Sequence, residues 1–501
     1  MIQTSLSPTL DGLFCRILAR QADAPALLDP LNKALITGQA AKRLTFGEAD
    51  RAISALSAHF IEAGLPANSV IAVQLPNTVE FMLTVLAAHR AGLIVALLPQ
   101  LWRQAELTMA LNRTGARAIV TSARIDGVNH ADLAMNAAAE AFSIRHVCGF
   151  GEDLPEGMAS LDDALRNPSA ATRTVTQDGR RPALITFDVT AEGFRAVPRT
   201  HLSLIAGGLA IFLESRIALG SRLMSAFAPS SFAGFAGSHL LWLLSGGTLA
   251  LHHPFDAEVL ERQIREDGCD ILIAPAQMAL RLTEFDLTAR LPALRSVIAL
   301  WRTPEQVASS APWTLEEVRF TDVYLFGEVG LFGACRTPDG LPAPIIIGPH
   351  GAPRDVPGTS VAGETLLTPL GTLGLRGAMV PVAAYAPPSP PSDSLVAQPM
   401  RDYVDTGYAA RLHRSSRAIM ITSPPAGLVS VGGYRFLSQD LQEWSRRLGQ
   451  GALLTALPDR LCGYRLAGRA QDNARGREAL SQLGLNPLMV EAFRDRTLLG
   501  Y

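Results

Sequence analysis

Short apolar runs alternate with longer helical segments through most of this 501-residue chain, and this alternation limits the fold more than any other feature. The runs at 70–76, 93–99 and 116–121 are typical of buried strands, and the segments at 79–92 and 103–113 between them have helical spacing. Strands that alternate with helices predict an α/β fold with doubly wound, mainly parallel sheets. Further strands are expected at 183–187, 222–228, 248–252, 270–275, 294–300 and 320–326, with a loop between 187 and a helix at 201–213.

The pattern changes twice towards the C-terminus. Short strands separated by Pro and Gly follow residue 336 and predict a small, mostly β subdomain over 336–425, inside an N-terminal domain of residues 1–425. The Pro-rich tract 387–393 is expected to be an exposed loop of this subdomain. Residues 426–501 have strand and helix signals of their own, which predict a small, shortened α/β cap.

Charge and apolar patterning exclude several classes of protein. A formal net charge of −2 and a pI near 6.6 give no electrostatic reason to expect nucleic acid or an anionic membrane as a partner. No apolar run reaches the roughly 18–20 residues of a membrane span, and the first twenty residues lack the regions of a signal peptide. The five cysteines have no metal-type spacing, so no metal site is expected. A cytoplasmic protein with free thiols is predicted.

The lysines are unusual in number. Lys33 and Lys42 are the only two in the chain, and every other basic side chain apart from histidine is arginine. Beyond Lys42, therefore, no ammonium group is present to take part in catalysis. An arginine does not reproduce the compact point charge of a lysine.

Several local motifs, in one order along the chain, carry a resemblance to a known family. The run from Leu44 to Val120 resembles the opening of acyl- and aryl-CoA ligases and peptide-synthetase adenylation domains, the adenylate-forming superfamily. PRTHLSL (198–204), LLSGGTLAL (243–251), DILIAPAQM (270–278), GTLGLRG (371–377), DTG (405–407) and VGGYRF (431–436) follow in family order and spacing. The resemblance covers nearly the whole chain and implies the same α/β fold.

The resemblance also implies a reaction, in which a carboxylate attacks the α-phosphorus of ATP and Mg²⁺ and positive groups stabilise the charge. ATP, Mg²⁺ and CoA are therefore the implied cofactors if the chain is a working ligase. Residues 187–199 occupy the phosphate loop of the family, but only Thr190 matches it and Arg195 stands at the lysine. Asp188 and Glu192 would place carboxylates beside a triphosphate, which they would repel.

The magnesium and ribose positions also depart from the family pattern. Phe326 and Gly327 match a family Tyr-Gly pair, but Gly330 stands at the magnesium-binding glutamate and Glu328 lies two residues early. Glu328 is either a substitute ligand or a locally paired carboxylate. Tyr408 stands at the ribose-binding aspartate, where a carboxylate would accept hydrogen bonds from two hydroxyl groups.

The remaining nucleotide positions are altered as well. Trp301 lies in the turn at the adenine site, where it either stacks on a base or packs as an ordinary indole. Pro424 replaces a family arginine, and the catalytic lysine of the family's cap has no counterpart. His201 is interpreted as the first residue of a helix and Asp405 as a turn residue. The Gly432-Gly433 pair either keeps the family's CoA-channel strand or serves only a bend.

An acid pocket is the part of the family site that could persist. The resemblance places it along residues 227–242, where Phe232, Phe235, Ala236 and Gly237 either line an apolar tunnel or form ordinary core. His239 either reaches a carboxylate there or is a hydrogen-bonded structural histidine.

Three readings of the function follow. The first is a family member that has lost ATP-dependent adenylation and binds an acyl or aryl ligand, a related synthetase or a carrier protein. The second is a working acyl- or aryl-CoA ligase whose nucleotide site uses Arg195, Glu328 and Trp301. The third is different chemistry on the inherited fold. We favour the first because five functional positions have changed and no neighbouring residue compensates for them.

Overall fold

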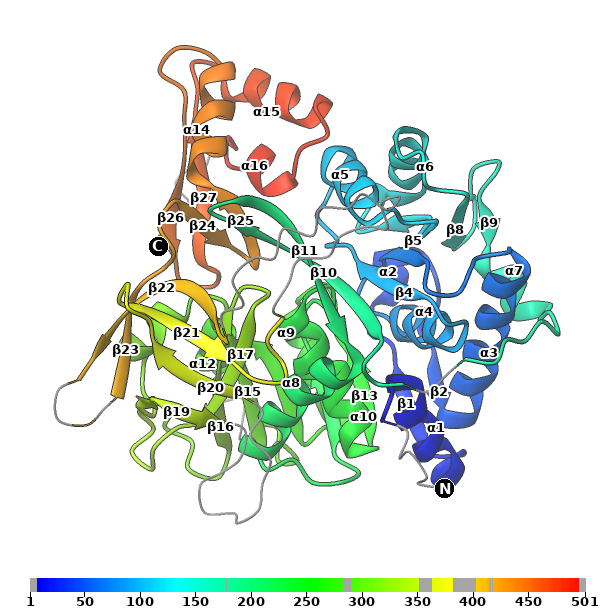
Figure 1. Ribbon diagram of the computed structural model, residues 1–501, viewed down its shortest axis with the longest axis horizontal. Helices are drawn as coiled ribbons and strands as arrows, with labels where there is room; N and C mark the ends of the chain where they lie inside the picture. The colour runs from blue at the N-terminus through cyan, green and yellow to red at the C-terminus, as the bar shows by residue number, and fades with distance from the viewer. Residues whose placement is uncertain are drawn as a thin grey trace.

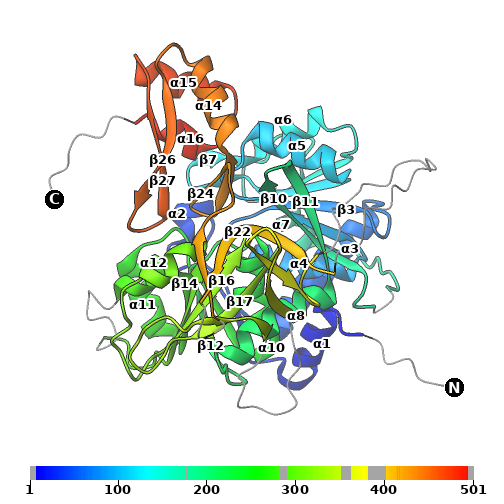
Figure 2. The same ribbon diagram turned by 60° about the vertical axis from the view of Figure 1, so that its left-hand side comes forward.

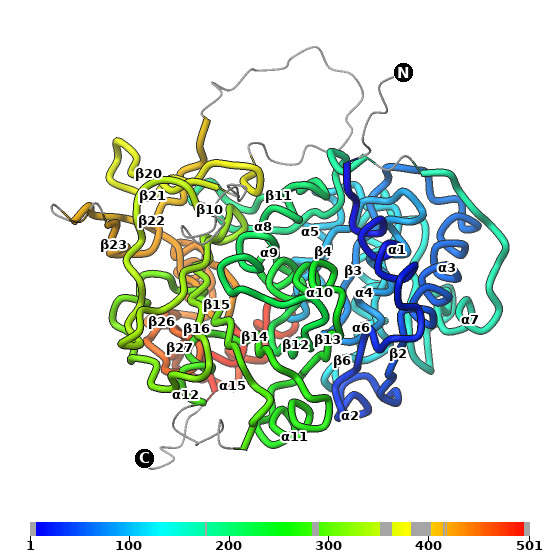
Figure 3. The backbone as a smooth tube through the Cα atoms, turned by 90° about the horizontal axis from the view of Figure 1, so that it is seen from below, coloured from blue at the N-terminus to red at the C-terminus, as the bar shows by residue number. Residues whose placement is uncertain are grey.

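The computed structural model describes residues 7–175, 178–282, 290–350, 363–381, 402–413, 416 and 418–494. Two large sheets lie side by side in the body, by which we mean the described residues before 426 (Figures 1 and 3). We refer to residues 426–494 as the cap, which lies at the upper left of Figure 1 in orange and red. Among the described residues, no helix combines the length and apolar character needed to cross a bilayer.

The first sheet has seven strands in the order β11-β10-β4-β3-β5-β8-β9. In this order, each pair of neighbouring strands from β10 through β4, β3, β5 and β8 to β9 is parallel. Strand β11 pairs antiparallel with β10 at the edge of the sheet. Its strands are β3 (Val70–Gln74), β4 (Ile94–Leu97), β5 (Ala118–Ser122), β8 (His146–Phe150), β9 (Ala159–Ser160), β10 (Pro182–Thr190) and β11 (Gly193–Thr200). The helices of this half are α3 (Phe46–Glu62), α4 (Val79–Arg90), α5 (Gln104–Thr114), α6 (His130–Glu140) and α7 (Leu161–Arg166), and a small ribbon joins β6 (Arg124–Ile125) to β7 (Val128–Asn129).

Strand β3 shows why helices cover both faces of this sheet. Ile71 and Val73 belong to the core formed with α3 and α4, whereas Val70 and Ala72 belong to the core formed with α5 and α6. Successive side chains of a strand point to opposite faces, so a fully apolar strand requires cover on both sides. The predicted doubly wound arrangement is confirmed.

The second sheet has eight strands in the order β17-β16-β15-β14-β12-β13-β1-β2. Its strands are β1 (Pro25–Leu28), β2 (Arg43–Thr45), β12 (Arg222–Ser225), β13 (Thr248–Leu251), β14 (Ile271–Pro275), β15 (Ser296–Trp301), β16 (Arg319–Phe326) and β17 (Gly330–Cys335). The helices of this half are α1 (Leu10–Gln21), α8 (His201–Glu214), α9 (Phe232–Gly234), the π-helix η1 (Phe235–Leu240), α10 (Leu241–Ser245), α11 (Ala257–Asp267), α12 (Ala276–Arg281) and the 3₁₀-helix η3 (Pro304–Ser309). Helix α2 (Lys33–Thr37) follows β1 in the chain and packs against β6 of the first half. The expected start of α8 at His201 is confirmed, since Thr200 caps that helix.

A third, antiparallel sheet of six strands forms the end of the body, in the order β18-β23-β22-β21-β20-β19. Its strands are β18 (Ile345–Ile346), β19 (Gly348–His350), β20 (Gly363–Leu367), β21 (Thr372–Arg376), β22 (Val404–Leu412) and β23 (Ala418–Ser423). This sheet agrees with the mostly β character predicted after residue 336. The Pro-rich tract 387–393 lies outside the described residues.

The cap has a small apolar core of its own. It contains β24 (Leu428–Val431), β25 (Tyr434–Leu437), α14 (Ser438–Arg447), β26 (Leu453–Asp459), β27 (Gly463–Arg469), α15 (Asn473–Gln482) and α16 (Pro487–Glu491). Gly432 and Gly433 form the two-residue turn of the β24–β25 hairpin with positive φ angles of 56° and 92°, which glycine adopts without strain. The core residues are Val431, Leu441, Leu454, Leu466, Leu480, Met489 and Phe493. A domain boundary near residue 425 stays a prediction.

The prediction of a loop between residues 187 and 201 is wrong. Strand β10 continues to Thr190 and returns as β11 after the two residues Ala191 and Glu192 (Figure 2). Phe187 and Phe194 pack ring to ring with centroids 5.4 Å apart. This cross-strand aromatic contact stabilises a hairpin, in the part of the chain where the family has a phosphate loop.

Both lysines of the chain lie in one buried charge cluster. The Lys33 ammonium lies 2.6 Å from Asp29 and 2.6 Å from Glu80, and Lys42 lies 2.8 Å from Glu80. Burial alone would raise the pKa of Glu80, but the two ammonium groups outweigh it and lower that pKa to about 2. The cluster joins the segment after β1 to helix α4, so both lysines have structural partners.

Candidate functional site

The positions assigned to the phosphate loop and the ribose are connected by a side chain from the cap. Arg435, on β25, donates to both carboxylate oxygens of Asp188 at 3.2 Å and to the Tyr408 hydroxyl at 3.1 Å. Asp188 also accepts a hydrogen bond from the Glu328 amide at 2.9 Å. We call Asp188, Arg435 and Tyr408 the Arg435 bridge. Burial opposes the charge of Arg435, but the Asp188 carboxylate outweighs it and raises the pKa of Arg435.

Gly327 allows this bridge to form. Its φ is +57°, and a Cβ atom there would lie 2.3 Å from an Arg435 nitrogen and 2.5 Å from an Asp188 oxygen. Any larger residue would therefore push the ion pair apart. The adjacent Phe326 is buried and packs edge-on against the Tyr408 ring, with centroids 5.4 Å apart.

Glu328 points into the body. Its carboxylate accepts a hydrogen bond from the Phe232 amide at 2.8 Å, and burial raises its pKa. The buried Arg199 donates to the carbonyl of Glu328 and, at 2.6 Å, to that of Met379. Its guanidinium also lies 3.4 Å above the Phe232 ring. Glu328 is thus a locally hydrogen-bonded carboxylate, and Gly330 has no side chain to take the role of a metal ligand.

Trp301 is not placed to stack on a nucleotide base. Only 2% of its surface is exposed, and its indole N–H donates to Asp322 at 2.7 Å. Asp322 in turn pairs with Arg336 at 2.9 Å. The alternative of a packed indole is the one that the structure supports.

Thr190 and Arg195 lie at the tip of the β10–β11 hairpin. The Thr190 hydroxyl donates to the Gly193 carbonyl at 3.3 Å, and Arg195 lies 4.0 Å from Glu192 across the turn. Arg195 is a half-buried partner of a neighbouring carboxylate. Asp405 accepts a hydrogen bond from the Gly407 amide at 2.8 Å, which agrees with its expected role in a turn.

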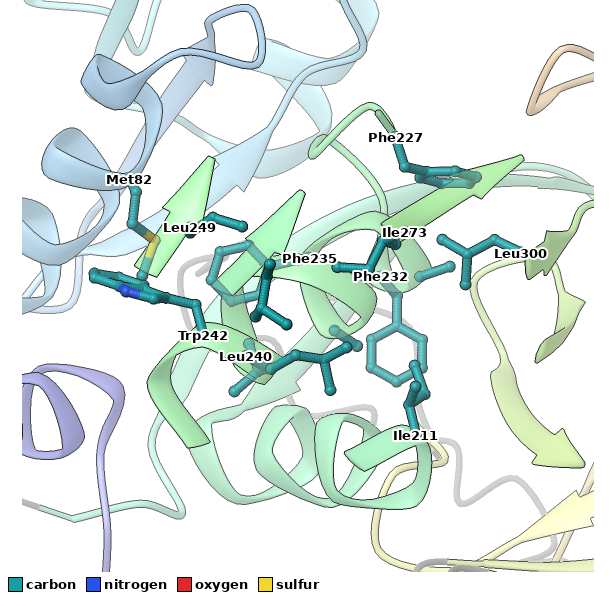
Figure 4. Packing of buried hydrophobic residues seen from close by; sticks show 14 of the residues in the cluster. Met82, Ile211, Phe227, Phe232, Phe235, Leu240, Trp242, Leu249, Ile273 and Leu300 are labelled. Carbon is teal, nitrogen blue, oxygen red and sulfur yellow. The ribbon is translucent and has the colours of Figure 1, made fainter. Parts of the chain in front are cut away.

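The residues of the expected acid pocket lie in the core. Phe232, Phe235, Ala236 and His239 have no exposed surface, and Figure 4 shows Phe232 and Phe235 among the side chains that fill the space between helices and strands. A Cβ on Gly237 would lie 3.3 Å from Leu300. The His239 ring stacks on Phe235, and burial lowers its pKa to about 3, so it is neutral. None of these five residues lines the cavity between the body and the cap, although Phe227, Ser231 and Ala233 of the same 227–242 stretch do.

A cavity of about 330 Å³ lies between the body and the cap. Its body side comes from α5, the β10–β11 hairpin and residues near β12 and β15, and its cap side comes from β24, β25, α14 and α16. Gly327, Glu328 and Asp188 also line it, so the cavity adjoins the positions that the resemblance assigns to the nucleotide. The sequence had singled out these segments one by one, but it did not show that they and the cap enclose one cavity. Its aromatic side chains are Trp102, Phe187, Phe194, Phe227, Tyr434, Phe436 and Trp444.

Hydrogen bonds seat the cap at the rim of this cavity. The Leu101 amide donates to the Tyr434 hydroxyl at 3.1 Å, and Arg302 donates to the Gly432 carbonyl at 2.7 Å. Together with the Arg435 bridge, these contacts fix the β24–β25 hairpin against the body. VGGYRF, the motif that contains these cap residues, was identified in the sequence, but its partners were not.

Glu106 is a titratable group on the body side of the cavity. Burial raises its pKa to about 7, although hydrogen bonds from the Arg103 amide, at 2.9 Å, and from Asn486 of the cap favour the charged form. The folded protein therefore holds a proton on Glu106 more tightly than the unfolded chain does.

This proton should make stability depend on pH. Because the pKa of Glu106 is raised on folding, its contribution is present near pH 5 and is lost as the pH rises through about 7. We expect the unfolding free energy of the wild type, relative to Glu106→Gln, to fall by about 1–3 kcal/mol between pH 5 and pH 8. Urea unfolding of both proteins at the two pH values measures this difference. The contributions of the other titrating groups are the same in both proteins and cancel in the difference. A constant difference would contradict the raised pKa.

The residues at the family's nucleotide positions fit one another and do not fit a triphosphate. The Asp188 carboxylate points into that region and is neutralised by Arg435 from the same chain, and the Tyr408 ring is buried there. Among the described residues, no group of three His, Cys, Asp or Glu side chains is arranged to hold a metal ion.

Comparisons with known proteins agree with the fold. A curated medium-chain fatty-acid–CoA ligase from Escherichia coli (strain K12) is 27% identical over 165 residues, which are 32% of this chain and only 29% of that relative. The crystal structure of a Brucella canis acyl-CoA synthetase matches at 18% identity and a TM-score of 0.62, covering 96% of this chain and 89% of that one. The amide bond synthetase of Marinactinospora thermotolerans matches at 15% identity and a TM-score of 0.68, covering 95% and 94%.

At these sequence identities the structural likeness demonstrates a shared fold and nothing more. The family assignment rests on a sequence match. A family model described as AMP-binding enzyme matches residues 14–340, well over half of the chain. The fold, the order of the motifs and this match agree, and the chain belongs to the AMP-binding enzyme family.

Proposed function

We propose that this chain is a member of the AMP-binding family that has lost ATP-dependent adenylation and acts as a ligand-binding or partner protein. The Arg435 bridge carries the proposal, because it places a buried ion pair of the protein at the positions where the family binds the phosphates and ribose of ATP. A triphosphate would have to break this pair and then meet the Asp188 carboxylate, which would repel it.

The family relationship supplies the classes of partner. Members of the family use ATP, Mg²⁺ and CoA to activate carboxylic acids, and some work with carrier proteins. A protein that keeps the fold without the nucleotide chemistry would keep the means to bind an acid, an acyl group, a related synthetase or a carrier protein. Of these, a small-molecule ligand is favoured by the cavity between body and cap.

The alternative of a working ligase depends on Arg195, Glu328 and Trp301. Arg195 is half-buried beside Glu192, Glu328 is hydrogen-bonded inside the body, and Trp301 is buried against Asp322. Each would have to leave its present partner before it could contact a nucleotide. This cost disfavours the alternative.

Calorimetry with ATP and Mg²⁺ tests the proposal. We expect no saturable binding at concentrations up to about 1 mM, a level that corresponds to roughly −4 kcal/mol. An active acyl-CoA ligase measured in the same buffer provides the positive control, and far-ultraviolet circular dichroism establishes that the protein is folded. Saturable binding below about 1 mM, followed by acid-dependent release of pyrophosphate, would refute the proposal and establish the ligase.

A further inference from the structure

We propose that the surface formed by α1, α10 and the turn after α8 docks onto a bilayer that contains anionic phospholipid, with Arg16 and Arg20 contacting the lipid phosphates. We call this surface the basal face; its residues are Leu13, Arg16, Ile17, Arg20, Leu219, Leu243 and Leu244. It lies at the bottom of Figure 1, away from the cap, and Figure 3 looks onto it. The inference goes beyond the proposed function, because this face contains none of the nucleotide positions and none of the residues that line the cavity under the cap.

An apolar groove of about 470 Å³ opens on the basal face between α1 and α10. Leu13 and Ile17 line it from one side of α1, and Leu243 and Leu244 line it from α10. Ile17 and Leu243 are buried, whereas Leu13 and Leu244 are half-buried and border the opening. Contiguous apolar surface of this kind marks a place where a protein contacts a partner or a membrane.

The apolar surface continues at the turn between α8 and β12. The Leu219 side chain is 81% exposed. The amide of the next residue, Gly220, donates to the Ser245 carbonyl at the end of α10 at 2.8 Å, and Gln21 at the end of α1 donates to the Gly246 carbonyl. These bonds bring the turn and the ends of both helices together. Leu219 is therefore an exposed apolar side chain beside the groove, as expected of a residue that enters the boundary between headgroups and acyl chains.

Helix α8 widens the face. It packs against the segment of α10 through Gly208, where a Cβ atom would lie 2.7 Å from Leu240. On another side of α8, Ala206, Leu209 and Leu213 recur at helical spacing and are half-buried. Figure 3 shows α8, α10 and α1 next to one another. A face that spans three helices is broader than a small ligand requires and suits an extended surface.

The free charge beside the groove is positive. Arg16 and Arg20 are exposed, lie about one helical turn apart on α1 and both line the groove. In the part of the chain that the structure describes, neither has an ion-pair or hydrogen-bond partner. The other charged residue of α1, Asp11, is paired with Arg90 at 2.8 Å, and the exposed carboxylate of Asp23 lies beyond the end of the helix. The whole chain has a formal charge of −2, so an attraction to anions here is local.

This charge selects the occupant of the face. An anionic bilayer presents phosphates directly beside apolar chains, which matches two unpaired guanidinium groups beside an apolar groove. A second copy of the chain, docked through the same face about a two-fold axis, would place the same positive surface on both sides of the interface. Like charges repel, so the second copy is disfavoured.

Sedimentation with vesicles tests the inference on the full-length protein. The two kinds of vesicle are pure phosphatidylcholine and phosphatidylcholine with about 30% phosphatidylglycerol. We expect saturable binding to the anionic vesicles, and binding to the neutral ones that is weaker by about tenfold or more. Raising the salt concentration to about 0.5 M should reduce the preference for anionic vesicles, because it screens the attraction.

Two pairs of variants localise the contact. Arg16→Gln with Arg20→Gln should weaken binding to anionic vesicles by about tenfold or more, whereas Arg446→Gln with Arg447→Gln, the same change in two exposed arginines of α14, should change it by less than about twofold. Leu219→Ser should weaken binding by about threefold or more. Its matched control is Leu370→Ser, since Leu370 is 79% exposed but lies in the turn between β20 and β21.

Several results would overturn the inference. They are absence of binding to anionic vesicles, equal binding to both kinds of vesicle, and equal losses in the basal-face and control variants. A wild-type dimer in light scattering that Leu219→Ser converts to a monomer would assign the face to a second copy instead. The comparison of vesicles uses the wild type alone, so it remains decisive if a variant does not fold. The proposed function is tested by a different measurement, the binding of ATP.

Discussion

Replacing Lys33 by methionine is expected to lower the free energy of unfolding by about 3–5 kcal/mol, the cost of leaving a buried charge without its partner. Lys33 has no exposed side-chain surface and lies 2.6 Å from both Asp29 and Glu80. In the variant, Glu80 would keep Lys42, but Asp29 would keep only the amides of Val79 and Lys42, both at 2.9 Å. Urea unfolding followed by circular dichroism measures the loss.

Lys42→Met is the matched control for this prediction. It makes the same chemical change in the same cluster, but the Lys42 side chain is 34% exposed and Lys33 remains beside Glu80. We expect a loss of about 1 kcal/mol or less, as for pairs that solvent reaches. Equal losses in the two variants would show that burial does not govern the stability of the cluster.

Arg435→Met is expected to destabilise the docking of the cap by about 3 kcal/mol, because Asp188 would remain buried with only amide donors. Amide hydrogen exchange in β10 and β25 should accelerate accordingly, since both strands carry members of the Arg435 bridge. Arg447→Met, which breaks an exposed pair with Glu443 on α14, should change exchange in these strands by less than threefold.

A double-mutant cycle assigns this loss to the ion pair. Asp188→Asn removes the negative charge at constant shape, so Arg435→Met should cost less in the Asp188→Asn background than in the wild type. The difference, the coupling energy, is expected to be about 2 kcal/mol. A coupling energy below about 0.5 kcal/mol would show that the two side chains do not hold the cap together, and would remove the main support for the proposed function.

Much of the fold could be predicted from local patterns. Strand β3 is a continuous apolar run because it is buried on both faces, and helix α4 follows directly with helical spacing. These features are local, so a sequence pattern records them. The strand at 183–187 was predicted, but the rest of β10 and all of β11 were predicted as a loop, because the hairpin is stabilised by Phe187 and Phe194 meeting across the strands, a contact that no single segment reveals.

Only part of the candidate site could be predicted from the sequence. The family motifs predict that Asp188 and Tyr408 stand where the family has other residues at its nucleotide site. They did not show what these side chains do instead, because Arg435 reaches Asp188 from 247 positions away in the chain. The cavity likewise depends on α5 of the body and α14 of the cap lining one space.

The sequence by itself determined the α/β fold class and the family, because both are recorded in neighbouring residues and in motif order. It also predicted the positions at which the nucleotide site differs from the family pattern. Only the tertiary structure decided that Arg435 bridges Asp188 and Tyr408, that Phe232, Phe235 and His239 are packed core, and that a cavity lies between the body and the cap. These features depend on which side chains, distant in the sequence, come into contact in the folded protein. The energy of each such contact depends on how deeply it is buried.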